Sequence, residues 1–257
     1  MKALVTSLWH ETRGQFERLP VWLPGTPMGL GDVGELGDGG WIRQTTLAEL
    51  GVSVRTRRST EPVDYDYSSS HGAEVSTTVA AGTDPALAGV VSGNAALRVR
   101  FTRPGAFVLR AASVRIHRIV NLAEVEERIL EMFDAGRWRR EWVLVSEVAR
   151  GGPTLTLVSN GTDGEAVVDL GVTGAAGVPL AQARAGLRIS RERGLAAKFV
   201  GAGESAVLWR GRRVRDPWFG VPRVADRGDQ EDVQQTEDRG RLNRYMLDIE
   251  HPEDLAD

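Results

Sequence analysis

The side chains that could do acid–base or metal chemistry are few in this chain, and they are scattered. The absence of cysteine excludes a disulfide framework, a thiolate metal site and a cysteine nucleophile. No two of the four histidines form an HExxH motif or another i, i+4 pair, so the usual zinc-ligand spacing is missing. These histidines are His10, His71, His117 and His251.

Asp64 and Asp66 form a carboxylate pair, because residues two apart in an expected strand point to the same face. Acid–base catalysis would also need a cleft and a further group, and a solvated strand face explains the pair more simply. Ser68–Ser70 directly precede His71, but sequence neighbours rarely form a nucleophile–base pair, and no GxSxG motif is present. We therefore expect no catalytic, cofactor-binding or metal-binding residues, no cofactor, and no enzymatic activity.

A basic and aromatic cluster offers chemistry of another kind: Arg137-Trp138-Arg139-Arg140-Glu141-Trp142. Its side chains could bind nucleic acid through phosphate contacts and base stacking, or an anionic membrane at the headgroup level. A third interpretation packs both tryptophans in the core while the arginines reach solvent. We expect no nucleic-acid partner. The membrane-contact candidates are Arg137, Trp138, Arg139 and Arg140, with Arg13 and Arg18 from a short helix expected within residues 3–19.

The overall charge conceals a division between the body of the chain and its C-terminal end. The 257 residues carry 32 basic and 35 acidic side chains, a net charge of −3. Residues 224–257 contain eleven acids and four arginines, a net charge of −7, which leaves +4 on residues 1–223. We therefore expect a domain at 1–223 and an acidic tail at 224–257. Such a tail can dock on the basic body or shield it, or it can be solvated and disordered.

Alternating strand patterns dominate the body, most clearly at 97–101, 107–111 and 114–116. One helix is expected at 121–133, with its apolar residues on one face and Asn121 as its N-cap. The fold class we expect is α+β, with a twisted, mostly antiparallel sheet and a few short helices.

Two strand-rich regions, 73–101 and 143–172, have strands near the length of about 9–11 residues that crosses a bilayer. Such strands are equally normal in a soluble α+β domain. The first twenty residues lack the pattern of a secretory signal, so we expect the protein to begin in the cytoplasm.

The order of these features resembles the pore-forming domain of the gasdermin family. The matching stretches are Gly40–Leu50, 64–116, the helix at 121–133, and the strand–turn–strand block from Glu141–Val148 to Val168–Gly171. The likeness is one of order and pattern and extends over most of residues 1–215. Bacterial members often carry a lipid-modified cysteine near the N-terminus, and this chain has none.

The resemblance implies a cytoplasmic pore-former of a bacterial defence or cell-death system, held inactive by its C-terminal segment. A protease would remove or displace the tail. The freed domain would bind anionic lipid, move to the inner membrane, turn its two β regions into membrane hairpins and oligomerise. The residues expected to hold the tail in place are Tyr245, Met246, Leu247 and Ile249. The alternative is a non-enzymatic binding or accessory module whose acidic tail docks a partner.

Overall fold

A computed structural model describes residues 2–37, 40–69, 71–79, 94–173, 188–215 and 245–248. Within these ranges the fold is α+β, as predicted, with two helices and two antiparallel sheets. The elements are α1 (Lys2–Phe16), β1 (Leu19–Pro20), β2 (Asp32–Gly37), β3 (Gly40–Thr46), β4 (Thr56–Arg58), β5 (Val63–Ser68), β6 (Ala73–Val79), β7 (Asn94–Phe101), β8 (Phe107–Ile119), α2 (Leu122–Asp134), β9 (Val143–Gly151), β10 (Thr154–Ser159), β11 (Glu165–Thr173), β12 (Arg188–Arg193), β13 (Leu195–Gly201), β14 (Ser205–Arg215) and β15 (Tyr245–Asp248).

The larger sheet has β8 as its longest strand. Its central order is β1-β14-β9-β8-β10-β13, and β15 pairs with β14, β2 with β3 and β9, and β4 and β5 with β8. The first half of β8 pairs with β5 and β10, and its second half with β4 and β9. Ser113, with φ of 54°, lies between the halves, and its N–H donates to Asp64 at 2.8 Å. β8 therefore carries the bend of this sheet.

The predicted helix at 121–133 is confirmed as α2, which buries Val125, Ile129 and Met132. Asn121 is the N-cap residue of α2, as expected, but its side chain makes no capping hydrogen bond to the helix backbone. Its Oδ1 instead accepts the Arg55 N–H at 2.7 Å, and its Nδ2 donates to Ser53 O at 3.3 Å. The asparagine therefore joins the helix start to the strand region before β4.

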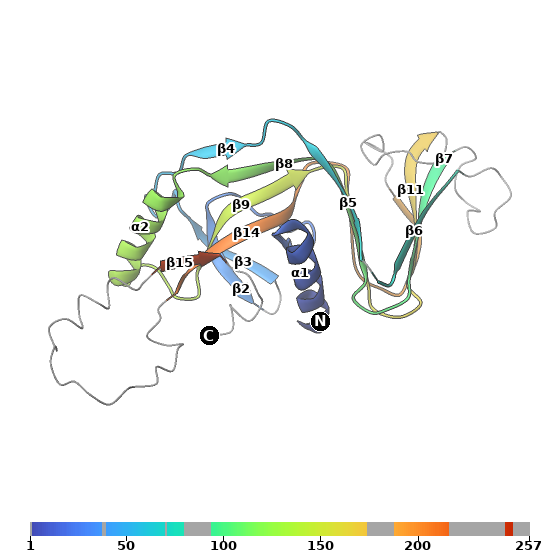
Figure 1. Ribbon diagram of the computed structural model, residues 1–257, viewed down its shortest axis with the longest axis horizontal. Coiled ribbons are helices and arrows are strands. Elements are labelled where there is room, and N and C mark those ends of the chain that lie inside the picture. The colour runs from blue at the N-terminus through green and yellow to red at the C-terminus, as the bar shows by residue number, and fades with distance from the viewer. Residues whose placement is uncertain are drawn as a thin grey trace, which may run out of the picture.

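The smaller sheet has the order β12-β11-β7-β6 and stands to one side of the larger one (Figure 1). It consists of two β-hairpins, β6–β7 and β11–β12, joined through β7 and β11. Strands leave the larger sheet, turn, and come back as the strands of the smaller sheet (Figure 1). The smaller sheet is thus folded back toward the larger one.

Candidate functional site

The two hairpins of the smaller sheet have one apolar face and one polar face. On β6, Ala73 and Val75 pack against a buried cluster while Glu74 and Ser76 are exposed. On β12, Ile189 packs against the same cluster, while the other five side chains are exposed. The alternation on β6 is the period-two pattern of a half-buried strand, whereas β12 is exposed except at Ile189.

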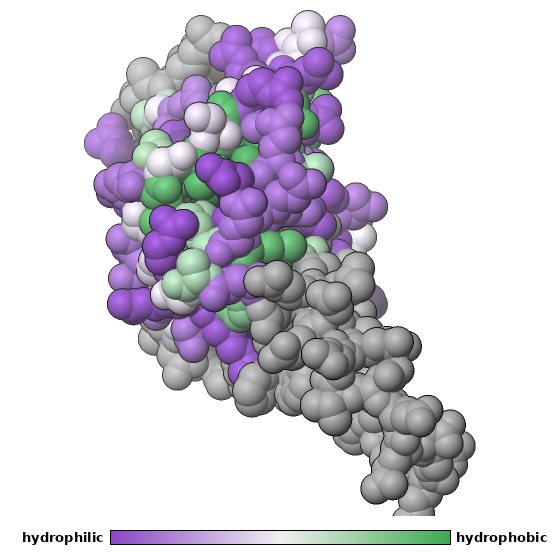
Figure 2. All heavy atoms as spheres, turned by 90° about the vertical axis from the view of Figure 1, so that its left-hand side faces the viewer, coloured by the Kyte–Doolittle hydropathy of each residue, from purple (hydrophilic) through white to green (hydrophobic). Residues whose placement is uncertain are grey.

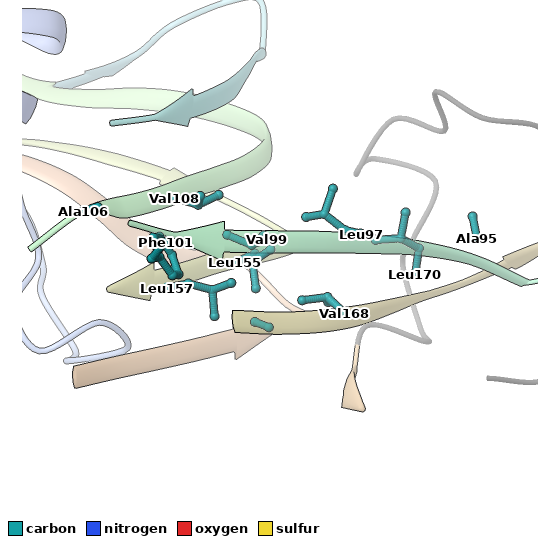
Figure 3. Packing of buried hydrophobic residues seen from close by; sticks show 11 residues of the cluster. Ala95, Leu97, Val99, Phe101, Ala106, Val108, Leu155, Leu157, Val168 and Leu170 are labelled. Atoms are coloured by element: carbon teal, nitrogen blue, oxygen red, sulfur yellow. The ribbon is translucent and has the colours of Figure 1, made fainter. Parts of the chain in front are cut away.

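The apolar face closes on β8 and β10 of the larger sheet. Figure 3 shows the packing, in which Val99 lies beside Leu155, and both belong to one buried cluster with Leu97, Val168 and Val108. All five side chains are fully buried. Burial of a Val or Leu side chain stabilises a fold by roughly 1.5–3 kcal/mol. The fold-back is therefore held mainly by this interface.

The polar face carries a row of alternating charges across all four strands. The backbone register sets Glu74 of β6 opposite Arg100 of β7, Arg100 opposite Glu165 of β11, and Glu165 opposite Arg193 of β12. Arg98, one row along, pairs diagonally with Glu165 at 3.5 Å. Opposite charges directly across from each other stabilise strand pairing, so the row supports the register of both hairpins.

The chain passes between the two sheets four times, in the connections from β5 to β6, from β7 to β8, from β10 to β11 and from β12 to β13. At the first bend the Ser69 N–H donates to Phe107 O at 2.9 Å, and the Phe107 N–H donates to Ser69 Oγ at 2.7 Å. Gly72 has φ of +95°, and a side chain there would collide with Arg103. Gly194, with φ of +62°, makes the whole connection from β12 to β13. These connections reverse the direction of the chain between the two sheets.

Helix α1 contacts the larger sheet beside these bends. Tyr67 Oη donates to Glu11 Oε1 at 2.9 Å, and Arg103 Nη2 lies 3.7 Å from Glu11 Oε2. The Phe16 ring packs on Tyr65, with ring centres 5.0 Å apart, and burial raises the pKa of the Tyr65 phenol. Arg103 lies in the connection from β7 to β8, which joins the smaller sheet to the larger one. Glu11 therefore links α1 to this connection.

The C-terminal strand β15 is paired with the end of β14. Met246 lies opposite Val214, and Asp248 lies opposite Arg212. Met246 is 5% exposed and belongs to a buried cluster with Val125 and Ile129 of α2. The described part of the tail is therefore bound to the body through backbone pairing and one buried side chain.

Three of the four residues predicted to hold the tail lie on β15: Tyr245, Met246 and Leu247. Ile249 lies outside the described residues.

Figure 2 shows the end of the molecule on the α2 side, where hydrophilic residues dominate the surface and apolar residues are exposed in small patches.

The membrane-contact candidates do not form one patch. Arg137 and Arg139 are exposed, and the Arg139 guanidinium lies 5.6 Å from the centre of the Trp142 ring. Trp138 is 3% exposed and packs edge-on against Trp142, so the interpretation that buries this tryptophan holds and it is not a surface contact here. Arg140 is half-buried.

The two α1 arginines lie away from this cluster, since α1 and α2 stand over different parts of the larger sheet (Figure 1). Arg13 is half-buried. Arg18 is largely buried and pairs with Glu147 of β9 at 2.6 Å, which anchors the end of α1 to the sheet. Arg18 therefore has a structural partner in this state, and its role as a membrane contact stays a prediction.

The residues considered for acid–base or metal chemistry are not brought together. Asp64 accepts the Ser113 N–H, Asp66 pairs with Arg110 at 2.8 Å, and both contacts are between β5 and β8. His117 is half-buried on β8, where burial lowers its pKa, and His71 is exposed at a bend. The His10 side chain and His251 lie outside the described part of the chain. Across the residues that the structure describes, no cluster of three His or acidic side chains could hold a metal ion.

A small cavity beside α1 is lined by Leu8, Phe107, Leu109 and Phe199, among others, and has a volume of about 20 Å³. This is close to the space that one water molecule requires. It is too small for a substrate.

The sequence of Ala73–Thr77 indicates the amphipathic character of β6, because apolar or β-branched residues alternate there with Glu74 and Ser76. The charge row could not be predicted from the sequence, because it depends on the pairing of β7 with β11, more than sixty residues apart.

No described helix is both long and apolar enough to cross a membrane. No protein-family model and no curated protein sequence matches the chain.

Proposed function

We propose that the protein is an autoinhibited membrane pore-former of a bacterial defence or cell-death system, similar to gasdermins, whose two hairpins enter the bilayer once the tail is displaced. The observation that carries the proposal is the smaller sheet. It holds two adjacent hairpins that share a mostly apolar face, and the residues of this face are buried in one cluster with residues of β8 and β10.

A membrane could replace the larger sheet as the cover of this apolar face. Strands that cross a bilayer present apolar residues to lipid and polar residues to the interior in alternation. The first hairpin has that alternation on β6, where Ala73 and Val75 face the buried cluster and Glu74 and Ser76 are exposed. In the second hairpin Val168 and Ile189 face the same cluster. Moving its apolar face into lipid exchanges one apolar environment for another, whereas opening it in water would expose all of it.

The sequences between the hairpin strands fit the same role. Residues 80–93 connect β6 to β7 and contain one charged side chain, Asp84. Residues 174–187 connect β11 to β12 and also contain one, Arg184. Charged side chains are costly in the centre of a bilayer, so this composition favours hairpins that insert their tips.

The tail supports the regulatory half of the proposal. It carries −7 against +4 on residues 1–223, and β15 occupies the end of β14. A protease cut between residues 216 and 244 would leave β15 held without a covalent link. Loss of the acidic segment would then leave a basic body with increased affinity for anionic lipid.

The test is dye leakage from liposomes. The full-length chain carries a specific protease site inserted after Arg223, so that it folds intact and is cut afterwards. We expect leakage from anionic liposomes only after the cut, and weaker leakage from zwitterionic ones. The same insertion without the protease is the control. If cut and uncut protein are equally inert toward liposomes and toward cells, the proposal fails. A co-purifying protein that is lost on deleting 224–257 would instead support an accessory module with a docking tail.

A further inference from the structure

The polar face of the smaller sheet carries more positive than negative charge. The cross-strand register places five arginines and three acids on this face, a net charge of +2 per copy. These residues are Arg98, Arg100, Arg188, Arg191 and Arg193, with Glu74, Glu165 and Asp169. Glu192 does not belong to them, because it lies opposite Ala166 on the other face and pairs with Lys198 of β13.

The charges lie in three rows across the four strands, and only the middle row has a net charge. The row nearest the larger sheet is the alternating one described above, in which two acids balance two arginines. In the third row Asp169 lies opposite Arg188. The middle row consists of Ser76, Arg98, Val167 and Arg191. It therefore holds two arginines and no acid.

The neighbouring rows do not neutralise these two arginines fully. Arg98 lies 3.5 Å from Glu165 of the first row, but Glu165 is also directly opposite Arg100 and Arg193. Arg191 is exposed and has no carboxylate partner among the described residues. One carboxylate shared by three arginines leaves positive charge in the middle row.

In a membrane β-barrel the polar face of each strand points into the water-filled interior. A ring of arginines around such an interior favours anions, as a ring of carboxylates favours cations. We propose that the pore passes anionic solutes in preference to cationic ones, and that Arg98 and Arg191 of each copy form the ring that sets this preference. This selectivity rests on the proposed function and deepens it, because it names the class of solute that crosses.

The other charges near the pore do not account for such a preference. The segments that connect the hairpin strands, 80–93 and 174–187, contain Asp84 and Arg184, whose charges cancel. Anionic lipid attracts cations to the membrane surface, which would favour cations at the pore mouth. A preference for anions in an anionic bilayer would therefore have to come from the protein.

The reversal potential in a planar bilayer measures this preference. Potassium and chloride move at nearly equal rates in water, so an unselective pore gives a potential near zero in a gradient of potassium chloride. The full-length chain with the inserted protease site is cut at an anionic bilayer. With about 0.1 M salt on one side and about 0.01 M on the other, we expect chloride to be roughly three times as permeant as potassium. At tenfold higher salt on both sides the ratio should fall toward one, because the Debye length becomes shorter.

Exposed positions of the middle row provide the variants. Arg191→Glu removes the net charge of the row and should bring the permeability ratio to about one. Adding Ser76→Glu makes the row negative and should reverse the preference toward potassium. Arg191→Lys keeps the charge and should keep the preference for chloride. Arg57→Glu is the matched control, because it makes the same charge change at an exposed site on β4 of the larger sheet, and it should leave the ratio unchanged.

The ratio does not depend on how many pores form, so a variant with reduced conductance is still informative. Ser76→Glu alone keeps every arginine in place and should lower the ratio without abolishing the preference. The test therefore does not depend on the behaviour of Arg191→Glu alone.

The outcomes separate selectivity from pore formation. Conductance without a preference for chloride, or with a preference that both Arg191→Glu and Ser76→Glu leave unchanged, overturns the inference and leaves the pore-forming proposal standing. An equal loss of preference in Arg57→Glu would assign it to the overall charge of the protein and overturn the role of the ring. No conductance from the cut protein overturns both proposals.

Discussion

The two sheets differ in how completely their second face is covered. In β9 of the larger sheet every side chain from Val143 to Ala149 is buried. Leu144 packs in the cluster with α2, and Val143 and Val145 pack in the cluster with Trp41 and Trp209. In β12, an edge strand of the smaller sheet, only Ile189 is even half-buried. Ala96 of β7 and Val167 of β11 are buried on the second face of the smaller sheet, but Glu74, Arg100 and Arg193 on that face are exposed. The larger sheet therefore has two covered faces at its centre, whereas the smaller sheet is covered mainly on one.

This difference indicates which sheet can separate from the rest of the fold without unfolding it. A strand covered on both faces cannot leave without opening two clusters. A sheet covered on one face can separate as a unit, since regions with fewer buried contacts open at lower free energy. The proposed function requires the smaller sheet and β15 to move. The smaller sheet is attached mainly through its apolar face, and β15 through its pairing with β14 and the buried Met246.

The largest expected effect compares the same substitution in the two sheets. Leu144→Asp and Leu97→Asp each put a carboxylate at a fully buried site. We expect each to cost at least about 4 kcal/mol locally. Leu144→Asp should abolish the fold. Leu97→Asp should remove hydrogen-exchange protection from β6, β7, β11 and β12 while β9 stays protected.

Ser76→Asp, on the exposed face of β6, is the control for these two variants and should leave protection unchanged. If Leu97→Asp also unprotects β9, the two sheets form a single cooperative unit and the comparison is wrong.

A smaller effect is expected at the tail strand. Met246→Ala removes the buried side chain that holds β15 against α2. We expect a loss of about 2 kcal/mol in the attachment of the strand, seen as roughly thirtyfold faster exchange of the amides of Tyr245–Asp248. The cut protein should also leak dye sooner. Met28→Ala, equally buried in another cluster, should leave β15 protected, and equal exchange in the two variants would refute a specific role for Met246.

The smallest effect concerns the contact of α1 with the bend. Glu11→Gln keeps an acceptor for Tyr67 but removes the charge that faces Arg103. Because Arg103 is partly exposed, we expect a loss of only about 0.5 kcal/mol in the attachment of the smaller sheet. Faster exchange in β6 and β7 would measure it. Glu127→Gln, at an exposed site on α2, is the matched control. Equal exchange rates in β6 and β7 of the two variants would show that the Glu11 contact does not stabilise the smaller sheet.

The sequence predicts much of the secondary structure because strand and helix periods are local. The alternation at 97–101 and 107–111 falls within β7 and β8, and the apolar face expected at 121–133 is the buried face of α2. Asn121 is the N-cap residue as predicted, but its side-chain oxygen accepts the Arg55 N–H and not a helix N–H. Local pattern cannot weigh a contact between residues 66 positions apart.

The candidate site was less predictable, because its features arise from pairing across the chain. Trp138 and Arg18 are residue types that suit a membrane surface, yet burial and the Glu147 ion pair occupy them in this state. The bends that fold the smaller sheet back involve residues that read only as turns. Three of the four tail candidates lie on β15, because Tyr245–Leu247 is a short apolar run within an acidic segment, and their role in inhibition stays a prediction.

The central claim is that the hairpins enter the bilayer with the face now buried against β8 and β10. The chain has no cysteine, so one fluorophore can be attached at a time, through cysteines substituted for Ala73, Glu74, Val75 and Ser76. Each labelled protein carries the inserted protease site and is cut in the presence of anionic liposomes that contain a lipid-soluble quencher.

We predict quenching with a period of two. Labels at positions 73 and 75 should be quenched after the cut and not before it, while labels at 74 and 76 should remain accessible to a water-soluble quencher. Uncut protein is the control for each position. Equal quenching on both faces, or none at any position, would contradict the account.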